Sequence, residues 1–269
     1  MCFLQLLTIP GVNAQSGIEI QPKYTVPGFQ TPEKETDIAM LGDGSALHLV
    51  LTGDPGLFAI VRLSLLVSLS AVFFAAVIGL PAGALLALTR FRGREALAVF
   101  LNALMGLPPV VVGLAVFLLL SRSGPLGEWG LLFTPQAMVV AQTFLVAPII
   151  AALTRQTVED LWVEYQAELT AMNVGPLRRV GTLIWDARFS LVTALLAGFG
   201  RAAAEVGAII IVGGNIDGFT RTMTTAIALE TSKGDLPLAI GLGMVLIVIV
   251  IAINALAWAA RRAGERYAG

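Results

Sequence analysis

Long hydrophobic segments without a charged residue alternate with short polar segments along most of this chain. Charge-free runs occupy 63–89, 96–121, 129–154 and 236–260. Each exceeds the about 20 apolar residues that a helix needs to cross the hydrocarbon core of a bilayer. A further hydrophobic segment, near 189–212, is interrupted only by Arg201 and Glu205. The pattern predicts an all-α membrane protein with five transmembrane helices, near 57–89, 96–121, 133–154, 188–213 and 236–260.

The composition supports this interpretation and excludes several classes of protein. Of the 269 residues, 57% are hydrophobic and 13% are charged, whereas a soluble domain carries about 25% charged residues. Cys2 is the only cysteine and His48 the only histidine, so we expect neither an internal disulfide nor a metal site of soft ligands. The net charge of -1 gives no indication of nucleic-acid binding.

Arginine and lysine residues predict the orientation, because short cytoplasmic loops hold most of the positive charge. The connections after the first and third predicted spans and the C-terminal tail contain Arg90, Arg92, Arg94, Arg155, Arg178, Arg179, Arg188, Arg261, Arg262 and Arg266. The opposite connections contain Arg122, Arg221 and Lys233. We therefore expect a multi-pass protein in the lipid of the cytoplasmic membrane, with its N-terminus outside and its C-terminus in the cytoplasm.

The segment 1–39 does not fit the pattern of spans. It is polar, and its apolar part, 3–12, is too short to cross a membrane and contains Pro10. It also lacks the positive region that begins a signal peptide. Two interpretations of this segment stay open. It can be a signal peptide, or it can be an upstream extension from a misassigned start, with Met40 as the working initiator.

Helix-breaking residues occur inside three predicted spans, at 79–81, at 106–109 and at Pro148. Proline removes a backbone donor and kinks a helix. Within a membrane the freed carbonyls must be satisfied by neighbouring groups or by a water-filled cavity. Kinked helices around a pathway and simple packing kinks are both consistent with this pattern.

The connection 155–187 is far longer than the about 2 to 8 residues that usually join neighbouring helices. Apolar residues recur at spacings of three and four over 158–172, which predicts an amphipathic helix. Asn173 and Gly175 tolerate the left-handed conformation that ends a helix, and Pro176 can begin another. A cytoplasmic hairpin of two helices is predicted, and an amphipathic hairpin resting on lipid would show the same pattern.

Several motifs in the chain resemble those of type I ABC importer permeases. Gln166-Ala167-Glu168, followed by Asn173-Val174-Gly175-Pro176-Leu177-Arg178-Arg179, is similar to their EAA loop. Alignment on Pro176 places Ala167 at the family's Glu and Asn173 at its Gly. Segments that resemble the tungstate-type permeases are 102–114, 121–127, 200–207, 213–216 and 220–231. The resemblance covers about 57–258, and its last segment is similar to tungstate rather than molybdate or sulfate permeases.

This resemblance implies a type I ABC transmembrane domain over 57–260, with a cytoplasmic coupling hairpin, that imports tungstate or a similar tetrahedral oxyanion. Molybdate and sulfate are the alternative substrates. The implied partners are a separate ABC ATPase subunit that binds ATP and Mg²⁺, an extracytoplasmic oxyanion-binding protein and a second copy of the chain. No Gly-x-x-x-x-Gly-Lys-Ser/Thr loop occurs in the sequence, so we expect no cofactor and no catalysis on this chain.

The resemblance also implies roles for two groups of residues. The ATPase-coupling group is Ala167, Glu168, Asn173, Gly175, Pro176, Arg178 and Arg179. The candidates for the pathway or its gate are Arg201, Glu205, Pro108, Pro109 and Asn215.

Arg201 and Glu205 lie four residues apart on one helix face, so they can form an ion pair. Charges within a bilayer are costly and usually face the bundle interior or a cavity. The pair can serve as a gate on the anion pathway or as an internal ion pair that fixes helix packing. The second role fits slightly better, because a strong anion site would trap the substrate that it must release.

A self-contained channel or proton-coupled carrier is the alternative from another class of function. A carrier would be expected to show carboxylates or histidines along several helices, and within the predicted spans Glu205, beside Arg201, is the only such residue. A membrane enzyme would need paired carboxylates, a nucleophile with its base, or a metal cluster in the bilayer. The sequence contains none of these patterns, and the permease interpretation is therefore favoured.

Overall fold

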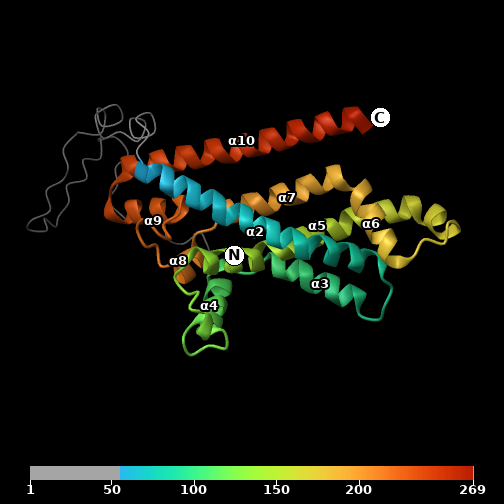
Figure 1. Ribbon diagram of the computed structural model, residues 1–269, viewed down its shortest axis with the longest axis horizontal. Helices are drawn as coiled ribbons and strands as arrows, with labels where there is room; N and C mark the ends of the chain where they lie inside the picture. Colours follow the sequence, from blue (N-terminus) through green and yellow to red (C-terminus); the bar gives the residue numbers. More distant parts are fainter. Residues whose placement is uncertain (1–54, 269) are drawn as a thin grey trace, which may run out of the picture. The chain divides into compact units, whose positions relative to one another are not determined.

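The computed structural model describes residues 55–268, and almost all of them are helical (Figure 1). Segment 1–39, Met40 and His48 lie outside the described residues. The prediction of an all-α chain is confirmed for residues 55–268, in which no strand occurs. The elements are α2 Pro55–Leu88, α3 Arg94–Met105, α4 Pro109–Leu120, the 3-10 helix η1 Gly127–Trp129, α5 Pro135–Ala171, α6 Pro176–Asp186, α7 Arg188–Ala203, α8 Gly207–Gly213, α9 Met223–Lys233 and α10 Leu236–Ala268.

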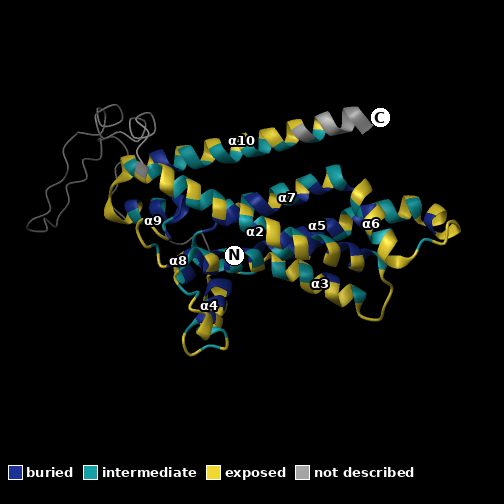
Figure 2. Cartoon of the chain, viewed as in Figure 1, coloured by how far each residue is buried: buried dark blue, intermediate teal, exposed yellow. Residues whose placement is uncertain are grey.

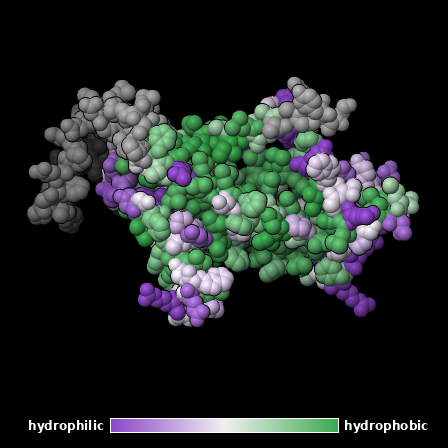
Figure 3. Space-filling model, viewed as in Figure 1, coloured by the Kyte–Doolittle hydropathy of each residue, from purple (hydrophilic) through white to green (hydrophobic). Residues whose placement is uncertain are grey.

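Three of these helices, α2, α5 and α10, are each long and apolar enough to cross a membrane. Two bent pairs pass the same test only as pairs: α3 with α4, bent by 98°, and α6 with α7, bent by 78°. If each bent pair counts as one span, the total is five. Hydrophobic side chains cover the middle of the face seen in Figure 3, and hydrophilic ones gather towards its ends.

Helices α2 and α5 pack along most of their length, because α2 carries small residues at every fourth position. These residues are Ala71, Ala75, Gly79, Gly83 and Ala87. A Cβ atom at Gly83 would lie 2.3 Å from the Ala151 carbonyl oxygen of α5. In a membrane, where apolar helices gain nothing by leaving lipid, such residues drive association by letting two backbones approach closely.

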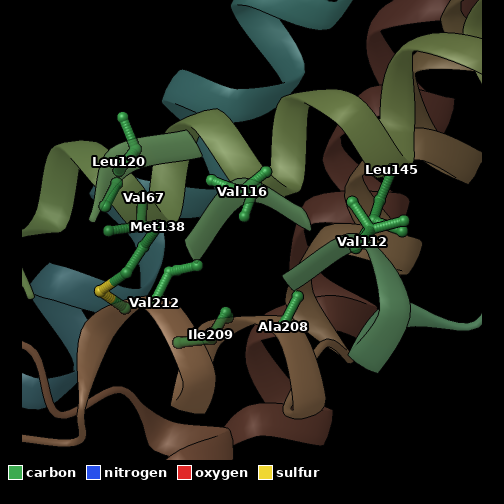
Figure 4. Close-up of a cluster of buried hydrophobic side chains, with 11 residues drawn as sticks. Val67, Val112, Val116, Leu120, Met138, Leu145, Ala208, Ile209 and Val212 are labelled. Atoms are coloured by element: carbon green, nitrogen blue, oxygen red, sulfur yellow. The ribbon is translucent and has the colours of Figure 1, made fainter. Parts of the chain in front are cut away.

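Buried residues form three clusters around this pair, and Figure 2 shows where the chain is buried. The first joins α2, α4, α5 and α8, and includes Val67, Val116, Met138 and Val212 (Figure 4). The second joins α2, α5 and α7 through Ala75, Val146, Ile150 and Ala202. The third joins the ends of α2, α5 and α6 through Ala84, Ala87, Val158, Leu169 and Leu183. Helix α10 contacts α9 and α7, but only 17% of its span is buried, against 67% for α5.

The helices differ from the predicted spans in three places. The segment 96–121 is two helices, because Pro108 and Pro109 lack the N–H groups that would continue α3. The segment 188–213 breaks between α7 and α8, at 204–206. The predicted span 133–154 and the predicted amphipathic helix 158–172 belong to one helix, because α5 continues to Ala171 without an interrupting Gly or Pro after Pro148.

Candidate functional site

The predicted coupling residues lie at the end of α5, in the turn 172–175 and at the start of α6. Asn173 has φ 52, the left-handed conformation predicted for it. Gly175 has φ -65 and ψ 156, which any residue can adopt, so the predicted left-handed role of this glycine is wrong. Pro176 is the first residue of α6, where a missing N–H costs no hydrogen bond.

Arg179 holds the 172–175 turn against α5. Its Nε donates a hydrogen bond of 2.7 Å to the Val174 carbonyl, and its guanidinium lies 5.4 Å from the centre of the Trp162 ring. This contact makes Arg179 a structural residue of the turn. The other predicted coupling residues are exposed: Ala167, Glu168, Asn173, Gly175, Pro176 and Arg178.

Two large apolar side chains beside the turn are also exposed, Met172 by 74% and Leu177 by 79%. The sequence pattern placed Met172 on the apolar face of the amphipathic helix. In the structure it lies just beyond the last residue of α5, where the helical periodicity no longer sets its direction. Together with Asn173 and Gly175, these two side chains form an exposed surface that we call the turn surface.

The breaks in the two discontinuous segments, α3–α4 and α7–α8, lie next to each other. A Cβ atom at Gly207 would lie 2.9 Å from Cγ2 of Val110, and one at Gly113 would lie 2.7 Å from Cα of Ala208. The beginning of α4, with Pro108 and Pro109, therefore contacts the beginning of α8. Neither sequence motif by itself indicated this contact.

The ion pair predicted between Arg201 and Glu205 is present across the α7–α8 break. Arg201 Nη1 lies 2.7 Å from Glu205 Oε2, and the Glu205 side chain is 2% exposed. Its other oxygen, Oε1, accepts a hydrogen bond of 3.0 Å from the Ala208 N–H in the first turn of α8. The Glu205 carbonyl accepts a hydrogen bond of 2.8 Å from the Thr224 hydroxyl. The acceptor groups of Glu205 are therefore used in joining α7, α8 and α9.

Asn215 lies at the opposite end of α8, apart from Arg201 and Glu205. It has φ 51, its Nδ2 lies 3.5 Å from the Thr225 carbonyl, and its buried Oδ1 has no partner among the described residues. The connection 215–237, which the predicted orientation places outside, contains α9. This helix begins with a capping box in which Thr222 and Thr225 exchange hydrogen bonds.

A small cavity, lined mainly by apolar side chains, lies beside the α7–α8 break. Its polar lining comprises Ser64, Ser68, Gln142, Thr222 and Thr224. Gln142 is 1% exposed, donates a hydrogen bond of 2.9 Å from Nε2 to the Ala202 carbonyl, and leaves its buried Oε1 without a partner in the described chain. The space open to the centre of a water molecule is about 10 Å³, room for about one water. The structure is therefore closed to larger solutes here. Sequence reasoning missed Gln142, whose only signal was an amide side chain within an apolar span.

Comparison with known proteins identifies the family of the chain. It is 39% identical over 215 residues to the tungstate uptake system permease protein TupB of Peptoclostridium acidaminophilum, covering 80% of this chain and 94% of that protein. The chain belongs to the tungstate-type ABC importer permeases. A probable anion ABC transporter permease of Haloferax volcanii is 41% identical over 80% of this permease and 92% of its own length. TupB of Campylobacter jejuni is 36% identical over 74% and 83%, respectively.

More distant relatives of this permease include a molybdenum transport permease of Azotobacter vinelandii, 30% identical, and a sulfate transport permease of Escherichia coli, 28% identical. No family model matches the chain. The relatives and the apolar helices together make the permease a multi-pass membrane protein and a non-catalytic subunit of its transporter.

Proposed function

We propose that this permease carries tungstate, or a similar tetrahedral oxyanion, across the cytoplasmic membrane as the membrane subunit of an ATP-driven importer. The main support is the 39% identity to a tungstate permease along 94% of that relative, compared with 30% and 28% to the molybdenum and sulfate permeases. Its partners in this proposal are an ABC ATPase subunit, an extracytoplasmic oxyanion-binding protein and a second copy of the permease.

The proposed orientation places the 172–175 turn in the cytoplasm. Exposed arginines lie at the same end of the molecule. They are Arg90 and Arg92 in the α2–α3 turn and Arg178 at the start of α6. Positive residues of short loops favour the cytoplasmic side. Helix α9 and the connection between α4 and α5 then face the binding protein, and the apolar outer faces of α2 and α10 meet lipid or the second copy.

The turn surface is the proposed docking site for the ATPase. Met172 and Leu177 expose apolar area that a partner can bury, and Glu168 and Arg178 stand beside them. The turn follows a single helix, α5, of 37 residues, which is about 55 Å long. Displacement of the turn by closing ATPase subunits would therefore move a helix that crosses the whole membrane, as in other rigid-body transitions.

Replacing Gly175 with tryptophan, or Glu168 with arginine, is expected to abolish ATP-driven uptake while membrane insertion and thermal stability stay unchanged. Nothing lies within 4 Å of a Cβ atom at Gly175 and its φ of -65 suits any residue, so the bulky side chain obstructs only a partner. Uptake into proteoliposomes and the unfolding midpoint of the purified permease measure the two effects.

Gly181→Trp is the matched control, because Gly181 is also exposed on α6 with nothing within 4 Å of a Cβ atom. It should transport normally. Normal uptake by both the Gly175 and the Glu168 variant would remove the turn surface from the mechanism.

The Arg201–Glu205 pair is proposed to hold the α7–α8 break rather than to bind the transported anion. We expect Arg201→Lys to retain most of the uptake, because lysine keeps the positive charge beside the Glu205 carboxylate. Uptake rates normalised to the amount of inserted permease give the comparison. Loss of uptake at normal expression would instead assign the guanidinium a specific contact with the substrate.

The experiment that tests the proposed function is uptake of labelled tungstate into vesicles that contain the permease, its ATPase and its binding protein. Accumulation that requires ATP and resists competition by molybdate is expected. Accumulation of another anion would keep the importer and change its substrate. Flux without ATP or without the ATPase subunit would favour a channel or carrier.

A further inference from the structure

An ionic cluster that includes none of the candidate site residues joins α2, α3 and α5 on the α2–α3 side of the 172–175 turn. It consists of Arg94 on α3 with Arg155 and Glu159 on α5. Arg94 Nη2 donates to Glu159 Oε1, and Arg155 Nη1 lies 2.8 Å from Oε1 and 3.0 Å from Oε2 of the same carboxylate. These side chains are only 22% to 31% exposed, so solvent screens the cluster less than it screens a surface ion pair.

Arg94 also binds the end of α2. The last carbonyls of a helix have no partner within the helix, and Arg94 satisfies two of them in α2. Its Nε donates to the Leu86 carbonyl at 3.0 Å and its Nη2 to the Ala87 carbonyl at 3.1 Å. A positive group at this position also interacts favourably with the helix dipole. One guanidinium therefore connects α2, the beginning of α3 and, through Glu159, α5.

Helix α3 contacts α5, but it buries few of its own residues. Ala98 is its one buried residue in the described chain, while Leu97, Val99 and Phe100 are exposed. Helices α2 and α5, by contrast, pack closely. A Cβ atom at Gly83 of α2 would lie 3.0 Å from the backbone nitrogen of Arg155 in α5. Helices α2 and α5 are held by direct backbone contact, and Arg94 adds a polar link from α3 to both of them.

Glu159 is joined to the turn by unbroken helix. Between Glu159 and Ala171 the axis of α5 rises about 18 Å, without Gly or Pro. The cluster of Val158, Leu169 and Leu183 packs α6 against this part of α5. If the turn moves, Glu159 therefore moves with it as part of the same helix. Glu159 in turn is bonded to Arg94 of α3.

We propose that Arg94 and Glu159 are a positioning pair that transmits movement of the α5–α6 segment to α3, and through α3 to the α3–α4 bend beside Glu205. The proposal rests on the proposed role of the 172–175 turn in docking the ATPase. Removing the pair uncouples α3 from the movement, so ATP is hydrolysed without the rearrangement that moves substrate.

The test is the number of tungstate ions imported per ATP hydrolysed by the complete transporter. We expect Glu159→Gln to lower this ratio about tenfold, a change within the usual range of coupling between sites. Subunit assembly and ATPase activity should persist. Asp160→Asn is the matched control, because Asp160 is exposed on the next position of α5 and should keep the wild-type ratio.

A double-mutant cycle separates transmission from stability. If the pair acts as a unit, Arg94→Gln, Glu159→Gln and the double variant should lower the ratio by the same factor, with unfolding midpoints that differ little from wild type. A ratio that stays at the wild-type value in Glu159→Gln overturns the proposal. The proposal is also overturned if transport falls only in proportion to the amount of folded protein.

A distance measurement on the permease alone keeps this proposal distinct from the proposed function, because it needs no transport. Spin labels at Val99→Cys and Gly181→Cys, in a Cys2→Ala background, report the separation of α3 from α6. The distance distribution should be narrow with Glu159 present and broad in Glu159→Gln. An unchanged distribution in that variant shows that the pair does not hold α3, and overturns the proposal even if uptake proves to be ATP-driven.

Discussion

Gly83→Leu is expected to prevent the permease from reaching its folded state. A Cβ atom at this position would lie 2.3 Å from the Ala151 carbonyl oxygen, 2.9 Å from Thr154 Cβ and 3.0 Å from the Arg155 nitrogen. Two of these atoms are backbone of α5 and cannot turn away, so α2 and α5 must separate. We expect destabilisation of at least about 3 kcal/mol, the upper part of the usual range for overpacking. Size-exclusion chromatography after solubilisation, with thermal unfolding, measures the loss of folded protein.

Gly243→Leu provides the control within another membrane helix. Gly243 lies in α10, and nothing lies within 4 Å of a Cβ atom there. Because glycine is a poor helix former, this variant should be as stable as wild type or more so. A monodisperse, transport-competent Gly83→Leu permease would show that the α2–α5 contact is not as close as described.

Glu205→Ala is expected to have the second largest effect, because it removes two side-chain interactions from one buried position. The variant leaves Arg201 without its partner and the Ala208 N–H without its acceptor. Loss of one member of a buried ion pair costs about 3–5 kcal/mol. We expect a lower unfolding midpoint, less inserted permease and loss of uptake, measured by thermal unfolding and by tungstate accumulation in vesicles.

Glu205→Gln distinguishes the two parts of this effect. Its amide oxygen can still accept the hydrogen bond from Ala208, so this variant should lose less stability than Glu205→Ala. Glu128→Ala, in the exposed connection after α4, should resemble wild type. If Glu205→Ala folds and transports normally, the α7–α8 break is held by other contacts.

Several elements were predictable because their signals are local. Absence of charge over 63–89 and 236–260 predicted α2 and α10, since a long apolar segment has few stable alternatives to a membrane helix. Asn173 was assigned a left-handed conformation from its residue type and its place after an amphipathic segment, and the structure agrees. The i,i+4 spacing of Arg201 and Glu205 was enough to predict their ion pair.

Other features could not be predicted in full where two local signals competed. The proline pair at 108–109 indicated a kink, but the structure has two helices bent by 98°. The charged residues from Arg155 onwards suggested that a span had ended, although nothing in their helix propensity ends a helix and α5 continues to Ala171. Hydropathy reports where lipid can surround a segment, and it does not report where the helix itself stops.

The sequence by itself determined that this protein is a helical membrane permease, where its apolar segments lie and which family it belongs to. These properties depend on composition, on spacing within one helix and on similarity along the chain. Only the tertiary structure decided that the two helix breaks touch, that Gln142 faces a cavity for one water, that Gly83 rests on the α5 backbone and that Arg94 reaches Glu159. Each of these contacts joins residues far apart in sequence, so it is set by how the helices pack and not by the periodicity of either partner.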